Sequence, residues 1–269
     1  MAGRYWRDLS TADIAALDAA RAIAVLPVAA IEQHGPHLPL DVDALINRGI
    51  VARTIELLPD DLPASFLPAQ EIGRSAEHIA FPGTLSADPE TLRRLWVEIG
   101  ESLHRSGLRK LVIFNSHGGQ PEVVDLVARD LRVRRGMLVV NASWYRLGYP
   151  PLDFGEEERL HGIHGGAIET SIVMHLRPDL VRRDKLADFR SISADFAANN
   201  ELLGPHRPIP FAWMTQDLNA AGACGNATLA DAETGRRLVD HAAERLVTLL
   251  REVTAFDLKL LRDVPGKAP

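Results

Sequence analysis

Residues 32–43 gather side chains that bind metal ions, directly after the apolar run 23–31, which the pattern predicts to be a buried strand. Three carboxylates and two imidazoles stand in this segment, and both groups are common ligands of first-row metals. Because residues two apart in extended backbone point the same way, Glu32 and His34 share one side, and Asp43 can return to it. The alternative is a solvated loop in which Asp43 only caps the following helix.

Further candidate ligands stand where the predicted element type changes. His117 follows an apolar strand and precedes two glycines, which let backbone and ligand approach closely. His164 and Glu169 lie in the segment 161–171, which opens another helix. Taken singly, each histidine is more often an ordinary polar contact than a ligand. Taken together with the candidates in residues 32–43, however, these residues are better explained by a metal site. Three other histidines in helical patterns are expected to be surface or helix-packing residues: His104, His175 and His241. His206 is expected in a loop.

Signatures of other catalytic machinery do not occur in the sequence. The glycine-rich segments at 115–120 and 164–166 contain neither a Walker lysine nor the G-x-G-x-x-G spacing, which disfavours a nucleotide-binding module. There is no G-x-S-x-G elbow, and the single cysteine, Cys224, has no evident activating neighbour. Serine or cysteine nucleophilic catalysis is therefore disfavoured as well.

Strands alternate with helices along the chain, which predicts a layered α/β fold with a mostly parallel sheet. The predicted strands cover 23–31, 64–67, 110–114 and 137–141. The predicted helices run from Ser10 or Thr11 to Ala20, over 44–58, 88–106 and 122–133, from the segment 161–171 to Pro178, and over 231–256. Residues 71–84 form a long connection with an expected functional role, and 184–228 are expected to be irregular. A single domain over residues 1–269 accounts for all of this, with candidate ligands at the carboxyl ends of strands, where open α/β sheets bind ligands.

Composition excludes several classes of partner. The chain has 269 residues, 46% of them hydrophobic and 25% charged, and a formal net charge of -6, which argues against binding to nucleic acid or anionic membranes. No apolar run approaches the ~20 residues of a membrane-spanning helix, and the first residues lack the apolar centre of a signal peptide. A lone cysteine permits no intrachain disulfide, so a cytoplasmic location is expected.

The motifs resemble the creatininase family of metal-dependent amidohydrolases. The likeness spans about residues 20 to 250. It rests on Glu32-Gln33-His34-Gly35-Pro36-His37-Leu38-Pro39 with Asp43, Phe81-Pro82-Gly83-Thr84, Asn115-Ser116-His117-Gly118-Gly119, Ile168-Glu169-Thr170-Ser171 and Gly225-Asn226-Ala227-Thr228. The resemblance implies a three-layer α/β/α fold, two divalent ions (Zn, Mn or Fe) per subunit, cleavage of a C–N amide bond, and a homo-oligomer, often a hexamer.

Residue by residue, the resemblance implies that Glu32 and His117 bind one metal, that His34 binds the other, and that Asp43 bridges them. It also assigns proton transfer to His164. Creatininase proper has His-Tyr-Glu where this chain has His117-Gly118-Gly119, so the glutamate of the second metal is missing. It also has a Trp-Asp-x-Glu run where this chain has residues 160–163. The pattern is closer to relatives that open other rings, remove formyl groups or trim a peptide, and creatinine is not the expected substrate.

Glu169 can supply the missing ligand. It lies five residues after His164, and the glycines between them allow the backbone to approach the cluster. The alternative is that a glutamate in the first turn of a helix only complements the helix dipole.

The resulting hypothesis is a metal-dependent amidohydrolase that cleaves a lactam, a formamide or a short peptide with a hydroxide activated by two metals. His164 would protonate the departing nitrogen. The residues expected to contact a small-molecule amide substrate are Ser75, Glu77, His78, Trp144 and Trp213. Two rivals remain open: a mononuclear non-haem iron enzyme, and a non-catalytic, metal-stabilised partner protein in a biosynthetic operon.

Overall fold

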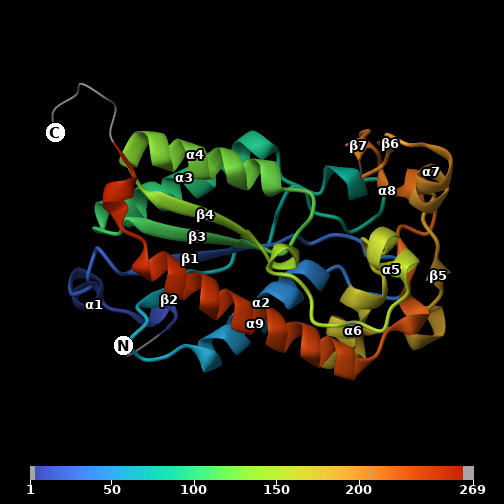
Figure 1. Ribbon diagram of the computed structural model, residues 1–269, viewed down its shortest axis with the longest axis horizontal. Coiled ribbons are helices and arrows are strands. Elements are labelled where there is room, and N and C mark those ends of the chain that lie inside the picture. Colours follow the sequence, from blue (N-terminus) through green and yellow to red (C-terminus); the bar gives the residue numbers. More distant parts are fainter. Residues whose placement is uncertain (1–3, 207, 263–269) are drawn as a thin grey trace.

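A four-stranded, entirely parallel sheet forms the centre of the protein (Figure 1). The computed structural model describes residues 4–206 and 208–262. The strands lie in the order β2-β1-β3-β4, with bounds β1 Ile23–Val28, β2 Ala64–Phe66, β3 Lys110–Asn115 and β4 Leu138–Ser143. Each strand except the edge strand β4 is buried throughout, as the continuous apolar runs predicted. The predicted parallel sheet is confirmed.

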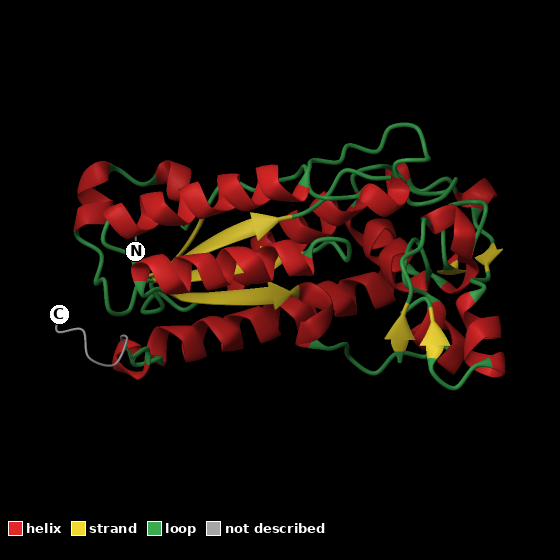
Figure 2. Ribbon diagram, turned by 90° about the horizontal axis from the view of Figure 1, so that it is seen from above, coloured by secondary structure: helices red, strands yellow, loops and turns green. Residues whose placement is uncertain are grey.

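Helices cover both faces of the sheet, giving three layers (Figure 2). One face carries α3 (Pro89–Arg105) and α4 (Pro121–Arg135); the other carries α2 (Val42–Leu57), α6 (Ala167–Leu176) and α9 (Ala232–Ala255). Alternate β1 residues separate these layers. Ile23 and Val25 belong to the core beneath α2, α6 and α9, whereas Ala24 and Leu26 pack with Trp96 of α3. The three-layer α/β/α prediction is confirmed.

Helices α6 and α9 cross very closely at one glycine. A Cβ atom on Gly235 of α9 would stand 1.9 Å from the carbonyl oxygen of Ser171 in α6, so no larger residue fits without moving the backbone. Ser171 also binds the start of the last helix, because its hydroxyl accepts the backbone N–H of Asp231 at 3.1 Å. These contacts fix α6, which carries Glu169, against the body of the protein.

The first predicted helix was too long. α1 spans Thr11–Ala15 rather than extending to Ala20, although Ser10 is the N-cap, as one of the two predicted candidates, and forms a capping box with Asp13. The helix buries no residue, and a short helix without tertiary packing has little to stabilise further turns.

The later part of the chain is more ordered than the sequence indicated. A helix not predicted, α5 (Glu156–His161), precedes the loop to α6, which begins at Ala167 and not in the loop itself. The segment 184–228, predicted to be irregular, contains α7, α8 and two small sheets, β5 with β8 and β6 with β7. Their bounds are β5 Asp188–Phe189, α7 Ser193–Asn199, β6 Leu203–Gly204, β7 Ile209–Pro210, α8 Thr215–Leu218 and β8 Gly225–Asn226. Two-residue strands are too short to leave a period in the sequence.

Single-turn 3₁₀ helices connect the larger elements: Trp6–Asp8, Ala76–His78, Trp144–Leu147, Pro178–Leu180, Arg183–Lys185, Ala227–Leu229 and Leu258–Leu260. Among the helices of the described residues, none has the length and apolar character needed to span a bilayer.

Candidate metal centre

The candidate ligands meet beyond the carboxyl ends of β1 and β3. Glu32 follows β1, and the bridge between Ile31 and Leu85 holds that segment in place. His117 lies two residues past the end of β3. Asp43 and Glu169 each lie in the first turn of a helix, α2 and α6. The fold thus brings together five residues from four separate segments, all predicted as ligands: Glu32, His34, Asp43, His117 and Glu169.

Glu32, Asp43 and His117 form the first triangle of ligand atoms. His117 Nδ1 lies 3.4 Å from Glu32 Oε1 and 3.4 Å from Asp43 Oδ2. Ligand atoms about 2.0–2.1 Å from a tetrahedral zinc ion stand roughly 3.3 Å apart, so the spacing suits one ion. All three residues are at most 2% exposed.

His34, Asp43 and Glu169 form the second triangle, which shares Asp43 with the first. His34 Nε2 lies 3.9 Å from Asp43 Oδ2 and 3.8 Å from Glu169 Oε2. Glu169 Oε2 also accepts the backbone N–H of Gly165 at 2.6 Å. That glycine has a φ of 62°, a left-handed conformation that other residues rarely adopt. The glycine-containing loop therefore does allow the close approach expected of Glu169.

Buried atoms in both triangles lack hydrogen-bond partners. Within the described part of the chain these include Glu32 Oε2, His34 Nε2 and Asp43 Oδ2. A buried polar atom left without a partner costs about 1–3 kcal/mol, and native structures contain few of them. Metal ions would satisfy all three atoms, so the residues present fit a metal centre.

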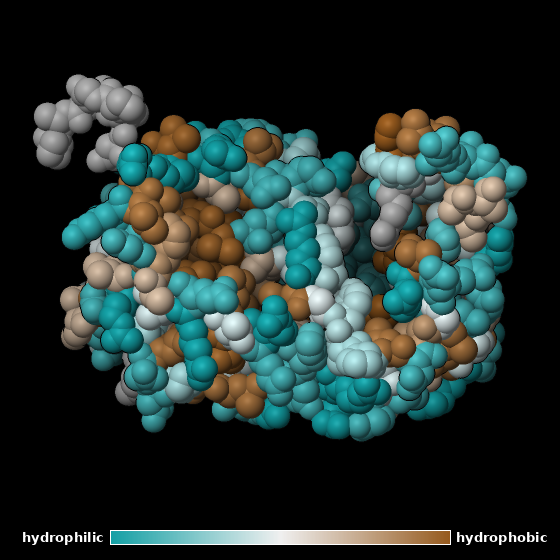
Figure 3. Space-filling model, viewed as in Figure 1, coloured by the Kyte–Doolittle hydropathy of each residue, from teal (hydrophilic) through white to brown (hydrophobic). Residues whose placement is uncertain are grey.

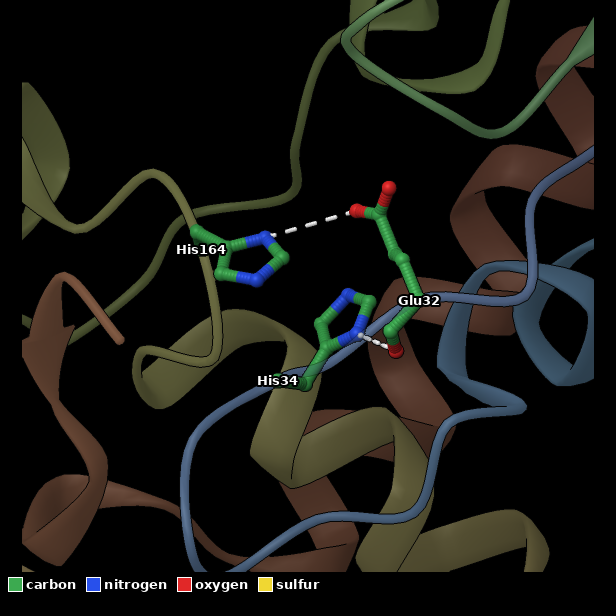
Figure 4. A group of neighbouring side chains, drawn as sticks. All are labelled: Glu32, His34 and His164. Carbon is green, nitrogen blue, oxygen red and sulfur yellow. Dashed lines mark hydrogen bonds and ion pairs between the residues drawn. The ribbon is translucent and has the colours of Figure 1, made fainter. Parts of the chain in front are cut away.

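Backbone carbonyl groups orient the two ligand imidazoles. His34 Nδ1 donates to the carbonyl of Glu32 at 3.0 Å (Figure 4), and His117 Nε2 donates to the carbonyl of Arg74 at 2.7 Å. Each bond keeps a ring proton on the outer nitrogen and directs the other nitrogen at the cluster, where its lone pair would bind a metal ion. Metal-binding histidines are commonly held in this way.

His164 lies inside the cluster rather than beside it. Its Nε2–H donates to the carbonyl of Gln33 at 2.7 Å, while Nδ1 faces Glu32 Oε1 at 3.7 Å (Figure 4). The ring stacks between those of His34 and His78, with centroids 4.1 and 4.2 Å away. Glu32, His34 and His164 thus make a third group of potential ligand atoms.

The electrostatics of the centre reflect buried charge. Burial, reinforced by the neighbouring Glu32, raises the pKa of Asp43 to about 6, and burial beside Asp43 raises the pKa of Glu169 to about 8. Burial lowers the pKa of His164 to about 4. His117 differs, because the charges of Glu32 and Asp43 outweigh burial and raise its pKa well above the usual value. Carboxylates crowded in this way are stabilised by bound cations.

A cavity of about 510 Å³ opens onto the cluster, and Figure 3 shows the surface hollowed on this side, between the main body and the part carrying β6 and β7. Of the residues predicted to contact substrate, Glu77, His78, Trp144 and Trp213 line it. Ser75 does not. It is fully buried, and its backbone N–H donates to Ser86 Oγ at 2.9 Å, so it helps to hold the long loop together.

Sequence reasoning missed other lining residues, among them Tyr145, Tyr149, Arg159, Leu160 and Ile163. The two tyrosines lie just past the carboxyl end of β4, where the rule for ligand sites in open sheets could have found them. Arg159 belongs to the unpredicted α5, and no pattern in the sequence marked it. Leu160 and Ile163 lie in the segment 160–163, where the chain departs from the family pattern, and that departure could have pointed to them.

The chain is similar to known proteins along most of its length. The family model described as "Creatininase: Creatinine amidohydrolase" matches residues 7–250. A "Mycofactocin precursor peptide peptidase" of Mycolicibacterium smegmatis is 32% identical over 228 residues, covering 82% of this chain and 83% of that protein. A "Creatinine amidohydrolase" of Pseudomonas putida is 32% identical over 186 residues, covering 62% of this chain and 68% of that protein.

Solved structures show the same fold. An "E122Q mutant creatininase, Zn-Zn type" superposes with a TM-score of 0.73 at 26% identity, covering 95% of this chain and all of that one. The predicted family resemblance is therefore confirmed. The chain belongs to the creatininase family of metal-dependent hydrolases.

Proposed function

We propose that this hydrolase cleaves a C–N amide bond at a centre of two divalent ions, one in each triangle, with Asp43 between them. The observation that carries the proposal is the pair of triangles that share Asp43, whose residues Glu32, His34 and Asp43 each have a buried side-chain atom without a hydrogen-bond partner. When bound, such ions lower the pKa of a shared water and polarise the amide carbonyl.

The residues of the chain would then divide the remaining work. His164 keeps its Nε2 proton on the Gln33 carbonyl, so Nδ1 is the atom that exchanges a proton. Because burial lowers its pKa to about 4, the ring enters the reaction neutral. It can take a proton from the attacking water and pass that proton to the departing nitrogen, which is a poor leaving group as an anion. This refines the predicted role of His164 from a donor alone to an acceptor and then a donor.

The substrate we propose is the amide of a short peptide, ahead of a lactam or a formamide. The cavity holds about 510 Å³ and is lined by Trp144, Tyr145, Tyr149 and Trp213, which offer more apolar surface than a formyl group or a small ring can cover. The peptidase relative, matched along most of its length, supports the same choice.

The identity of the metal ions, the oligomeric state and the cellular location are further parts of this proposal. Zinc is the first metal to test, because a creatininase neighbour is described as a Zn-Zn type, with manganese and iron next. A homo-oligomer, as a hexamer in the cytoplasm, remains a prediction that light scattering and fractionation can test.

The experiment is a hydrolysis screen after metal analysis. The purified chain is stripped, reloaded separately with Zn, Mn or Fe, and supplied with short peptides, lactams and formamides. The proposal expects about two ions per chain and fastest release of amine from a peptide. Lack of amide hydrolysis with all three metals would contradict it.

One observation favours a second candidate. Glu32, His34 and His164 supply two imidazoles and one carboxylate, the donor set of mononuclear non-haem iron enzymes. One iron per chain together with turnover that requires oxygen would establish this alternative.

A further inference from the structure

The amide of Gln33 is held in one orientation by two backbone groups. Its Oε1 accepts the N–H of Gly35 at 2.9 Å, and its Nε2 donates to the carbonyl of Gly222 at 2.7 Å. Exchanging the oxygen and nitrogen would place like against like at both contacts. Gly222, with a φ of 81°, leaves no space for a side chain here, since a Cβ atom would stand 2.3 Å from Gln33 Oε1.

The second N–H of that amide has one available acceptor. Gln33 Nε2 lies 2.8 Å from His78 Nδ1 and 3.3 Å from His164 Nε2. His164 Nε2 already carries a proton, which it donates to the Gln33 carbonyl, so it cannot accept another. His78 Nδ1 must therefore be the acceptor, because Gln33 is only 6% exposed and a buried unpaired N–H would cost about 1–3 kcal/mol.

The tautomer of His78 follows from this. With Nδ1 accepting, the ring proton sits on Nε2, which lies 3.3 Å from Glu32 Oε1. The ring is buried and stacks on His164, which limits its freedom to turn. His78 was predicted to contact substrate, and it does line the cavity, but its proton points to the carboxylate of Glu32.

We propose that Gln33 and His78 are a positioning pair: Gln33 sets the tautomer of His78, and His78 Nε2–H holds the carboxylate of Glu32 in the direction of the metal site. The inference rests on the proposed function in one respect, the binding of a metal by Glu32. It assigns His78 no place among the ligands. Outer partners of this kind typically affect metal affinity 10–100-fold.

Thr215 provides the competing account. Its hydroxyl lies 2.8 Å from His78 Nδ1 and 3.0 Å from the carbonyl of Glu77. If His78 Nδ1–H donated to Thr215, Nε2 would carry a lone pair and His78 would be a metal ligand itself. The proposal instead has the Thr215 hydroxyl share its proton between His78 Nδ1 and the carbonyl of Glu77, so that Nδ1 stays an acceptor and Gln33 still sets the tautomer.

Nitrogen NMR of the full-length protein reads the tautomer directly. In protein labelled with ¹⁵N-histidine, free of metal and loaded with zinc, we expect the protonated resonance of His78 to be Nε2 in both states. A proton on Nδ1, or a zinc-shifted Nε2, overturns the proposal. Absence of zinc binding would instead remove the metal role of Glu32 while leaving the metal-free tautomer measurable, so the two failures are distinguishable.

Zinc affinity, measured by competition with a chelator, tests the consequence. We expect His78→Leu to weaken zinc binding at the Glu32 site about 10–100-fold, and His78→Gln, which retains an N–H donor, to restore most of it. Gln33→Met should weaken binding too, and the double variant Gln33→Met/His78→Leu should be no worse than His78→Leu alone. The matched control Thr215→Val should leave the affinity unchanged. Weaker binding in Thr215→Val with no change in Gln33→Met contradicts the proposal.

Discussion

The two triangles share Asp43 but are built from different parts of the molecule. The first takes Glu32 and His117 from just beyond the ends of the adjacent strands β1 and β3, and His117 Nδ1 lies 3.4 Å from each of the two carboxylates. The second takes His34 from the loop after β1 and Glu169 from α6, with spacings of 3.8 and 3.9 Å. The Glu169 side chain is 15% exposed, whereas that of Glu32 is 1% exposed. We therefore expect the sheet to preform the first site more completely than the second.

A buried carboxylate outside the cluster holds the second triangle in place. Glu158 of α5 accepts the backbone N–H of Ala167, at the start of α6, and that of Asn226 in β8, each at 2.6 Å. Between these points His164 pairs with Cys224 through two backbone hydrogen bonds of 2.7 and 3.2 Å. The second triangle thus depends on contacts between segments distant in sequence.

The largest effect is expected where the triangles meet. Asp43→Ala should remove about two metal equivalents and the activity with them, because Asp43 belongs to both triangles and would serve an ion in each. Elemental analysis of the purified variant measures this. Asp41→Ala is the matched control, since Asp41 is partly exposed and pairs with Arg48. Full occupancy of both sites in Asp43→Ala would show that Asp43 is not a ligand shared by two ions.

Glu169→Gln should weaken metal binding in the second triangle and leave the first triangle unchanged. We expect the loss of about one metal equivalent and most activity, with the fold intact, because the second triangle loses a charged ligand and the first keeps all of its own. Elemental analysis with circular dichroism checks both points. Glu157→Gln, an exposed glutamate paired with Arg190 at 3.3 Å, controls for the change of charge. Two bound ions in Glu169→Gln would return Glu169 to the role of complementing the helix dipole.

His164→Ala should lower kcat by roughly 10²–10⁴ while both ions remain, the usual contribution of acid–base catalysis. Steady-state kinetics beside metal analysis measures the two outcomes. His161→Ala is the control on the same segment, since His161 bonds Ser193 at 2.9 Å and does not line the cavity. Loss of metal from His164→Ala would instead show that His164 is a ligand. The metal would then be held by the third group, Glu32, His34 and His164.

The smallest effect is expected from Glu158→Gln, which sets an amide N–H against a backbone N–H. We expect about tenfold weaker binding of the second ion only, from the loss of one buried hydrogen bond. Cys224 reports the accompanying loosening: it is fully buried and burial raises its pKa to about 11, so thiol labelling requires local opening. Labelling should be faster in Glu158→Gln than in Glu157→Gln. Equal labelling rates would show that Glu158 does not hold this segment.

The sequence predicted what local patterns determine. The strand before Glu32 and the strand before His117 were visible as apolar runs, and parallel pairing then required their ends to meet. Glu169 was found by asking which residue could replace the side chain absent at Gly119. The structure also explains why position 119 has no side chain: a Cβ atom on Gly119 would stand 1.9 Å from Glu77 Oε1.

Partners distant in sequence could not be predicted in this way. Gln33 meets His78 across 45 residues and Gly222 across 189, and no local period links them. The role of Glu158 likewise depends on a helix that the sequence did not reveal. Ser75 was predicted to contact substrate because it stands on the long connection 71–84, but the direction of one side chain on an irregular loop is set by tertiary packing.

Anomalous diffraction from zinc-loaded crystals, recorded at the zinc absorption edge, would show directly whether the two triangles hold two ions that share Asp43. We expect two peaks per chain about 3.5–4 Å apart, the first beside Glu32 and His117, the second beside His34 and Glu169, with Asp43 between them. A single peak per chain, or two peaks that Asp43 does not bridge, would exclude the shared centre.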